Sequence, residues 1–184
     1  MRATGISRSI DSLGRIVIPK EIRRNMRIRE SDLLEFYAGE EGELILKKYS
    51  PMGELVAFAR EYAESLYQVS GYVSLITDRD QVIAAAGGCK DSIMKRVSIS
   101  LQQKMEERQV VLFEKGDKCI SPFLQTDGEQ LQFMSFGMAP ILCQGDVVGS
   151  VILLSKDENK KMGDIEKKLL QAAATFLGRQ MELG

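Results

Sequence analysis

The sequence contains no histidine, and its 184 residues include only three cysteines, Cys89, Cys119 and Cys143. Without an imidazole, the chain can form no Ser-His or Cys-His nucleophile and offers no histidine ligand for zinc. The cysteines are odd in number and none is spaced as a CxxC pair, which favours free thiols. Walker A, GxSxG and HExxH patterns are missing as well. We therefore expect no enzyme, no metal and no cofactor.

Long apolar runs are also missing. The longest, from Val147 to Leu154, is far too short to cross a membrane. The first residues lack the apolar core of a signal peptide. Hydrophobic residues make up 44% and charged residues 28%, a balance typical of globular proteins. These features predict a cytoplasmic protein with no membrane partner.

The formal net charge is only −1, but the charges are unevenly distributed. Residues 1–29 carry eight cations, seven of them arginines, against two carboxylates. Residues 30–48 carry two lysines against six carboxylates. The planar fork of donors on arginine suits phosphate groups and guanine edges. The early basic segment therefore favours a polyanion such as DNA as partner over a merely solvated surface.

The first fifty residues read as one small unit of short elements. A unit of this size buries little apolar surface, and its short strands leave open edges. Exchange of hairpins between two chains would close those edges, so we expect a dimer. The pattern predicts strands over 3–10, 16–18, 33–38 and 44–46, and a helix over 20–26 after Pro19.

The run LGRIVIPKEIRR, which begins at Leu13, is the most specific motif of the chain. With the residues Thr4-Gly5-Ile6, it closely resembles the AbrB-type swapped-hairpin DNA-binding domain over the first quarter of the chain. This resemblance implies an intertwined dimeric barrel that lays basic loops and helix ends on double-stranded DNA. Such a domain reads DNA shape more than a strict base code. Antitoxins share this fold, so fold alone does not fix the role.

The same resemblance singles out individual cations. Four match DNA-contacting positions of the domain: Arg8, Arg15, Arg23 and Arg24. Three more are candidates: Arg2, Lys20 and Arg27. The alternative for each is a solvated surface cation. Asp11 is expected to organise the turn or to pair with an arginine. Ser9 stands where relatives often carry a second basic residue, so affinity or site choice is expected to differ.

A break at Ser50-Pro51-Met52-Gly53 marks the end of this domain, which gives domains 1–50 and 51–184. The second domain reads as an antiparallel sheet with flanking helices, and the whole chain as α+β. Its element order resembles a GAF-type sensor domain. The apolar stripes of its first and last helices suit either its own sheet or a partner helix. Helices are predicted over 54–70, 92–96, 99–108 and 163–183, with strands over 73–76, 82–86, 110–113, 133–142 and 147–154.

Both domains together resemble, over essentially the whole chain, late-sporulation transcription regulators of endospore-forming bacteria. The resemblance implies activation and repression in the developing spore by a tetramer of two N-terminal dimers. A small-molecule ligand would be placed near the loops 87–91 and 114–132, and a purely oligomerising role is the alternative. An antitoxin-like module is disfavoured, because residues 54–184 are predicted to fold. A small-molecule sensor with secondary DNA binding is a third hypothesis.

Overall fold

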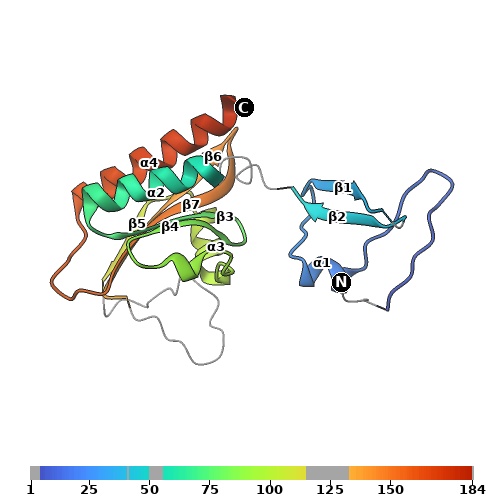
Figure 1. The fold of residues 1–184 in the computed structure, drawn as a ribbon, viewed down its shortest axis with the longest axis horizontal. Coiled ribbons are helices and arrows are strands. Elements are labelled where there is room, and N and C mark those ends of the chain that lie inside the picture. The colour runs from blue at the N-terminus through green and yellow to red at the C-terminus, as the bar shows by residue number, and fades with distance from the viewer. Residues whose placement is uncertain (1–4, 41, 50–55, 115–132, 184) are drawn as a thin grey trace. The chain divides into compact units, whose positions relative to one another are not determined.

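The computed structural model describes residues 5–40, 42–49, 56–114 and 133–183. The chain divides into two compact units, Met1–Tyr49 and Ser50–Gly184, which are drawn in Figure 1. The first unit contains a two-stranded sheet and the second a five-stranded sheet. The two units differ in how far their apolar side chains are buried.

The first unit consists of one short helix and one hairpin. Helix α1 (Lys20–Asn25) begins directly after Pro19, whose fixed φ suits a helix start. Strands β1 (Leu34–Ala38) and β2 (Leu44–Lys48) pair in antiparallel fashion. The helix and the hairpin predicted from the sequence are thereby confirmed.

The hairpin has one apolar and one polar face, because side chains alternate along each strand. On the polar face, the Tyr37 hydroxyl donates to Glu35 Oε2 at 2.7 Å, and Lys47 Nζ lies 4.5 Å from the centre of the Tyr37 ring. On the apolar face, Phe36 lies opposite Leu46. Phe36 is nevertheless 68% exposed. The side chains of the polar face pair within one chain, whereas Phe36 and Leu44 on the apolar face remain exposed.

The strands predicted over 3–10 and 16–18 are not formed by the described residues 5–10 and 16–18 of the single chain. A strand needs a hydrogen-bonding neighbour, and the described part of this chain supplies none at these positions. Three of their apolar side chains, Ile10, Ile16 and Val17, are exposed, and Val17 is 74% exposed. Across residues 5–40 and 42–49, no residue is buried. One chain therefore gives this unit no hydrophobic core.

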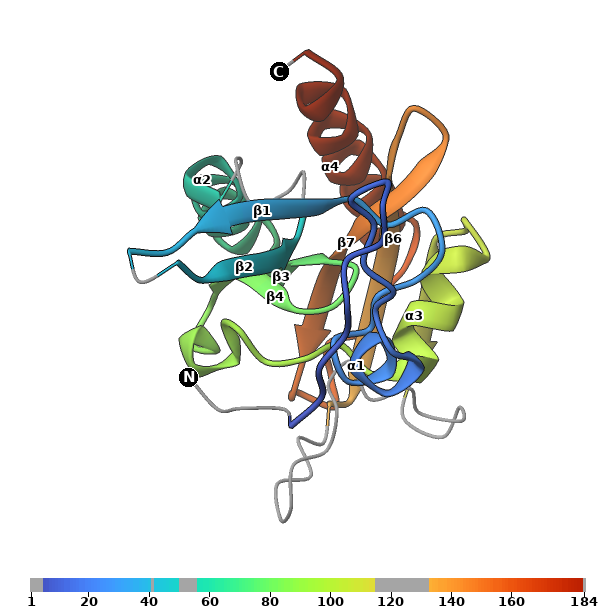
Figure 2. The ribbon, with the colours of Figure 1, turned by 90° about the vertical axis from the view of Figure 1, so that its right-hand side faces the viewer.

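The second unit is an antiparallel sheet in the order β4-β3-β7-β6-β5, with β7 at its centre. Strands β6 and β7 are the longest pair and lie side by side (Figure 2). They are joined at Gln144 and Gly145, which both have the positive φ of a two-residue hairpin turn. The predicted antiparallel sheet is confirmed. Its strands are β3 (Val73–Asp78), β4 (Val82–Ala86), β5 (Val111–Glu114), β6 (Ser135–Cys143) and β7 (Asp146–Ser155).

Helices cover both faces of this sheet, with α2 and α4 on one face and α3 on the other (Figure 1). Alternate side chains of β7 pack into two hydrophobic cores, one on each face of the sheet. Val151 and Leu153 belong to the core under α2 and α4, whereas Ile152 and Leu154 belong to the core under α3. All four are fully buried, so this unit has its own hydrophobic core. The helices are α2 (Val56–Ser70), α3 (Ile99–Glu106) and α4 (Asp164–Leu183).

Helices α2 and α4 also carry apolar side chains that the sheet does not cover. Phe176 of α4 stacks on Phe58 and Tyr62 of α2, with ring centres 5.6 and 5.3 Å apart. At the other end of the pair, Val69 is 75% exposed and Ile165 is 72% exposed. We call this surface the helix-pair face. Its exposed or half-buried members are Phe58, Tyr62, Val69, Ile165, Leu169, Ala172 and Phe176.

Two glycines of this unit lie where neighbouring backbones approach closely. A Cβ on Gly149 in β7 would lie 2.0 Å from the Thr77 carbonyl oxygen. A Cβ on Gly178 in α4 would lie 2.1 Å from the Leu142 carbonyl oxygen. Both distances are far shorter than a real contact, and the opposing atom is backbone. No larger residue fits at either position without a backbone shift.

The predicted helix over 92–96 is wrong. Only Lys90–Ser92 forms a single 3₁₀ turn. The Met94 N–H donates to the Val82 carbonyl at 2.8 Å, and the Val82 N–H donates to the Lys95 carbonyl at 3.0 Å. Met94 also has a φ of 68°. Pairing with the strand β4 therefore overrides the local helical pattern.

Candidate nucleic-acid interface

Four of the predicted DNA-contacting arginines lie on three segments of the first unit. Arg8 belongs to the open segment 5–10, and Arg15 closes the turn that follows it. Arg23 and Arg24 occupy the last turn of α1. All four are exposed, and cations in the last turn of a helix are favourably placed relative to its dipole.

The three further candidates differ in their surroundings. Lys20, the first residue of α1, is exposed. Arg27 follows the helix with a φ of 52° and is only half-exposed. Arg2 lies outside the described residues. The structure thus presents Lys20 to solvent more openly than Arg27.

Asp11 organises the turn that carries Arg15. Its Oδ1 accepts hydrogen bonds from the backbone N–H groups of Leu13 and Arg15 at 2.9 and 2.8 Å. Its Oδ2 accepts from Arg15 Nε at 2.8 Å. Gly14 has a φ of 75°, a left-handed conformation that favours glycine. The hydrogen bonds from Arg15 hold the pKa of the Asp11 carboxyl below its usual value. Asp11 therefore stays ionised at neutral pH and fixes one edge of the Arg15 guanidinium.

A half-buried ion pair fixes the chain after α1. Lys48 Nζ of β2 lies 3.2 Å from Asp32 Oδ2 and also donates to the Arg27 carbonyl at 3.3 Å. Asp32 Oδ2 accepts from the Arg29 N–H at 2.7 Å. Sequence reasoning missed this pair, because the two residues are far apart in the chain and only the hairpin brings them together. It ties the arginine-bearing end of α1 to the sheet.

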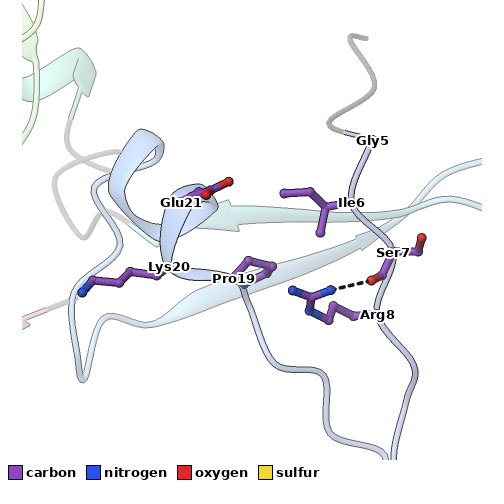
Figure 3. A pocket seen from close by; sticks show the side chains of 7 residues that line it. All are labelled: Gly5, Ile6, Ser7, Arg8, Pro19, Lys20 and Glu21. Atoms are coloured by element: carbon purple, nitrogen blue, oxygen red, sulfur yellow. Dashed lines mark hydrogen bonds between the residues drawn. The ribbon is translucent and has the colours of Figure 1, made fainter.

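An open hollow of about 580 Å³ lies between the first described segment and the start of α1. Figure 3 shows segment 5–8 on one side and Pro19, Lys20 and Glu21 on the other. Arg8 Nη1 donates to the Ser7 carbonyl at 2.9 Å. Arg8 and Lys20 both line the hollow, and the Lys20 side chain points away from segment 5–8 (Figure 3). Its lining residues are Gly5, Ile6, Ser7, Arg8, Pro19, Lys20 and Glu21.

The loops named as candidate ligand loops lie in the second unit. In the loop 87–91, Gly87 and Gly88 have positive φ and Cys89 is buried. Apart from Glu114, the loop 114–132 lies outside the described residues. Within the described part of the chain, no group of three acidic or cysteine side chains could hold a metal ion. None of its helices is long and apolar enough to span a membrane.

Comparisons with known proteins agree with this two-part architecture. The model of the MazE antitoxin family matches residues 8–54. The transition state regulatory protein AbrB of Bacillus subtilis is 55% identical over 51 residues, which are 28% of this chain and 52% of that protein. The first unit is thus an AbrB-type N-terminal domain.

The second unit has the GAF fold. The GAF domain of an Acinetobacter phosphoenolpyruvate-protein phosphotransferase matches with a TM-score of 0.58 at 14% identity, over 73% of this chain and 84% of that one.

Two comparisons span most of the chain. The family model "Stage V sporulation protein T C-terminal, transcription factor" matches residues 54–182. Stage V sporulation protein T of Bacillus subtilis is 48% identical over 183 residues, which cover 99% of both proteins. The chain belongs to the stage V sporulation protein T family of transcription factors.

Proposed function

We propose that this chain is a DNA-binding transcription regulator that activates and represses late sporulation genes in the cytoplasm of the developing spore. Residues 1–50 bind double-stranded DNA, and residues 51–184 provide oligomerisation and regulation. Neither part has a catalytic role. The observation that carries the proposal is the set of exposed cations on three segments of an AbrB-type unit. The proposed DNA contacts are Arg2, Arg8, Arg15, Lys20, Arg23, Arg24 and Arg27.

The DNA-binding head in this proposal is a dimer of intertwined N-terminal units. One chain leaves segments 5–10 and 16–18 without strand partners and leaves the Phe36 face of the hairpin open. A second copy has the matching apolar surface, since both chains present the same one. Mutual exchange of hairpins would pair the free segments and bury both faces in one core.

Arg15→Ala and Arg23→Ala should each weaken binding to a duplex recovered by in vitro selection on the full chain. Each lost phosphate contact lowers the salt slope by about one unit, so a head of two chains loses about two. Fluorescence anisotropy across a salt series measures both quantities. Lys167→Ala, an exposed cation of α4, is the matched control and should bind normally. Unchanged binding in both arginine variants would contradict the site assignment.

We also propose that two dimeric heads are joined into a tetramer through contacts between helix-pair faces. Val69 and Ile165 are too exposed to belong to the core of their own chain. Ile165, Leu169, Ala172 and Phe176 recur at spacings of four and three, the pattern of helix-to-helix packing. A second helix pair laid on this face would make a four-helix bundle.

Ile165→Glu should convert a species of four chains into one of two chains. A buried carboxylate without a partner disfavours the bundle, whereas the N-terminal head is untouched. Light scattering coupled to size exclusion reports the mass. Gln171→Glu adds the same charge on another side of α4, where the residue is exposed, and should keep the wild-type mass. If Ile165→Glu keeps it too, the helix-pair face is not the tetramer interface.

Two other functions have weaker support. The antitoxin model matches only residues 8–54, and the following unit has a core of its own instead of a short polar tail. For small-molecule sensing, the described residues between the sheet and α3 are packed with apolar side chains such as Leu75, Leu101 and Ile152. Oligomerisation is therefore the role that we assign first to the second unit.

A further inference from the structure

The contacts of Arg15 leave one edge of its guanidinium open. Asp11 Oδ2 binds Nε, while Asp11 Oδ1 binds the Arg15 backbone N–H. Nη1 and Nη2 have no hydrogen-bond partner among the described residues. A guanidinium held through Nε presents its two terminal amino groups side by side, as a planar two-pronged donor.

The turn itself resists reorientation of this donor. The Asp11 N–H donates to the Arg15 carbonyl at 3.1 Å, and the Gly14 N–H donates to the Asp11 carbonyl at 3.0 Å. Together with the three bonds to the Asp11 carboxylate, five hydrogen bonds link residues within 11–15. All are local in sequence, so they do not depend on how a second chain packs.

We propose that Asp11 is a positioning residue that holds Arg15 for two-pronged recognition of a paired acceptor on DNA. The inference rests on the proposed DNA binding and deepens it. Two groups of DNA offer such a pair, the O6 and N7 atoms of guanine and the two free oxygens of one phosphate. A carboxylate near DNA would otherwise only repel phosphates, so positioning explains why Asp11 stands beside a DNA-facing arginine.

Arg15→Lys separates positioning from charge, because lysine keeps the charge but has neither Nε nor a planar fork. The probe is a duplex recovered by in vitro selection on the full chain, and the readout is affinity across a salt series. We expect Arg15→Lys to lose about tenfold in affinity with the wild-type salt slope. Arg15→Ala should lose both affinity and slope. Asp11→Asn should lose about as much affinity as Arg15→Lys, although it removes a negative charge.

The opposite pattern overturns the inference: Arg15→Lys binds as wild type, and Asp11→Asn binds as wild type or more tightly. Arg15→Lys leaves the backbone bonds of the turn in place, so wild-type binding by this variant alone overturns the inference even if Asp11→Asn misfolds. Circular dichroism and elution volume check both variants. If the wild-type chain binds no duplex at all, the proposed function fails and this inference fails with it.

A second duplex, with 7-deazaguanine in place of guanine, identifies the acceptor. If Arg15 contacts a guanine edge, the wild type loses affinity on this duplex and its advantage over Arg15→Lys disappears. If Arg15 contacts a phosphate, the wild type binds both duplexes equally and the advantage persists. Either result names the acceptor of the Arg15 fork, and the Asp11→Asn variant tests its positioning.

Discussion

Phe36→Ser should abolish DNA binding while leaving the second unit folded. Phe36 lies on the apolar face of the hairpin and is 68% exposed in one chain, whereas the proposed dimer buries it. Truncating a buried aromatic side chain costs about 3 kcal/mol or more, and each head contains the residue twice. The variant should then associate only through the helix-pair face, giving two chains in light scattering and no shift in a DNA-binding titration.

Tyr37→Ser is the matched control, since Tyr37 is the next residue but points to the polar face of the same strand. It loses one exposed hydrogen bond to Glu35 and one contact with Lys47. Such losses amount to about 1 kcal/mol. Tyr37→Ser should keep both the mass and the DNA affinity of the wild type. Equal behaviour of the two variants would show that the Phe36 face is not an interface between chains.

Gly178→Ala should strongly destabilise the second unit, although it adds only one methyl group. The new Cβ would lie 2.1 Å from the Leu142 carbonyl oxygen, so α4 must move away from β6. Leu170, Ala173 and Leu177, the buried residues that hold α4 on the sheet, would move with it. Overpacking of this kind costs about 3 kcal/mol, and denaturant unfolding monitored by circular dichroism measures it.

Gly163→Ala provides the comparison for Gly178→Ala. Gly163 directly precedes α4, and the nearest atom to its added Cβ would be Glu166 Oε2 at 3.9 Å, an ordinary contact. The free energy of unfolding of the Gly163→Ala variant should lie within about 0.5 kcal/mol of the wild-type value. A Gly178→Ala protein as stable as Gly163→Ala would mean that α4 shifts freely on the sheet.

Sequence patterns predicted the second unit well because its elements are settled by contacts within one chain. The apolar period of α4 and the turn Gln144-Gly145 are local signals, and each matches the structure. The segment 92–96 failed because Met94 and Lys95 pair with Val82, a contact that no local pattern reports. The Asp32–Lys48 ion pair was not predicted either, because it too joins residues that no local pattern connects.

In the first unit, strand formation depends on whether a pairing partner belongs to the same chain. The segments around Val17 and Phe36 are rich in apolar residues typical of buried strands, and the sequence predicts a strand at each. Only the Phe36 segment forms one, because its partner β2 belongs to the same chain. The exposed positions of Arg15 and Arg23 could be anticipated from their motif. The motif does not indicate which edge of the Arg15 guanidinium Asp11 occupies, because this depends on the conformation of the turn 11–15.

The first unit buries no residue in 5–40 and 42–49, and this has a consequence for how gene control responds to synthesis of the protein. In the proposed dimer, a newly made chain would carry a folded C-terminal unit but only half of a DNA-binding head. Heads then arise from encounters, and below the dissociation constant their number rises with the square of chain concentration. Doubling the rate of synthesis would give about four times as many heads. In the proposed dimer, the genes under its control would therefore respond more steeply than in proportion to expression, because two copies of the apolar face are needed for each head.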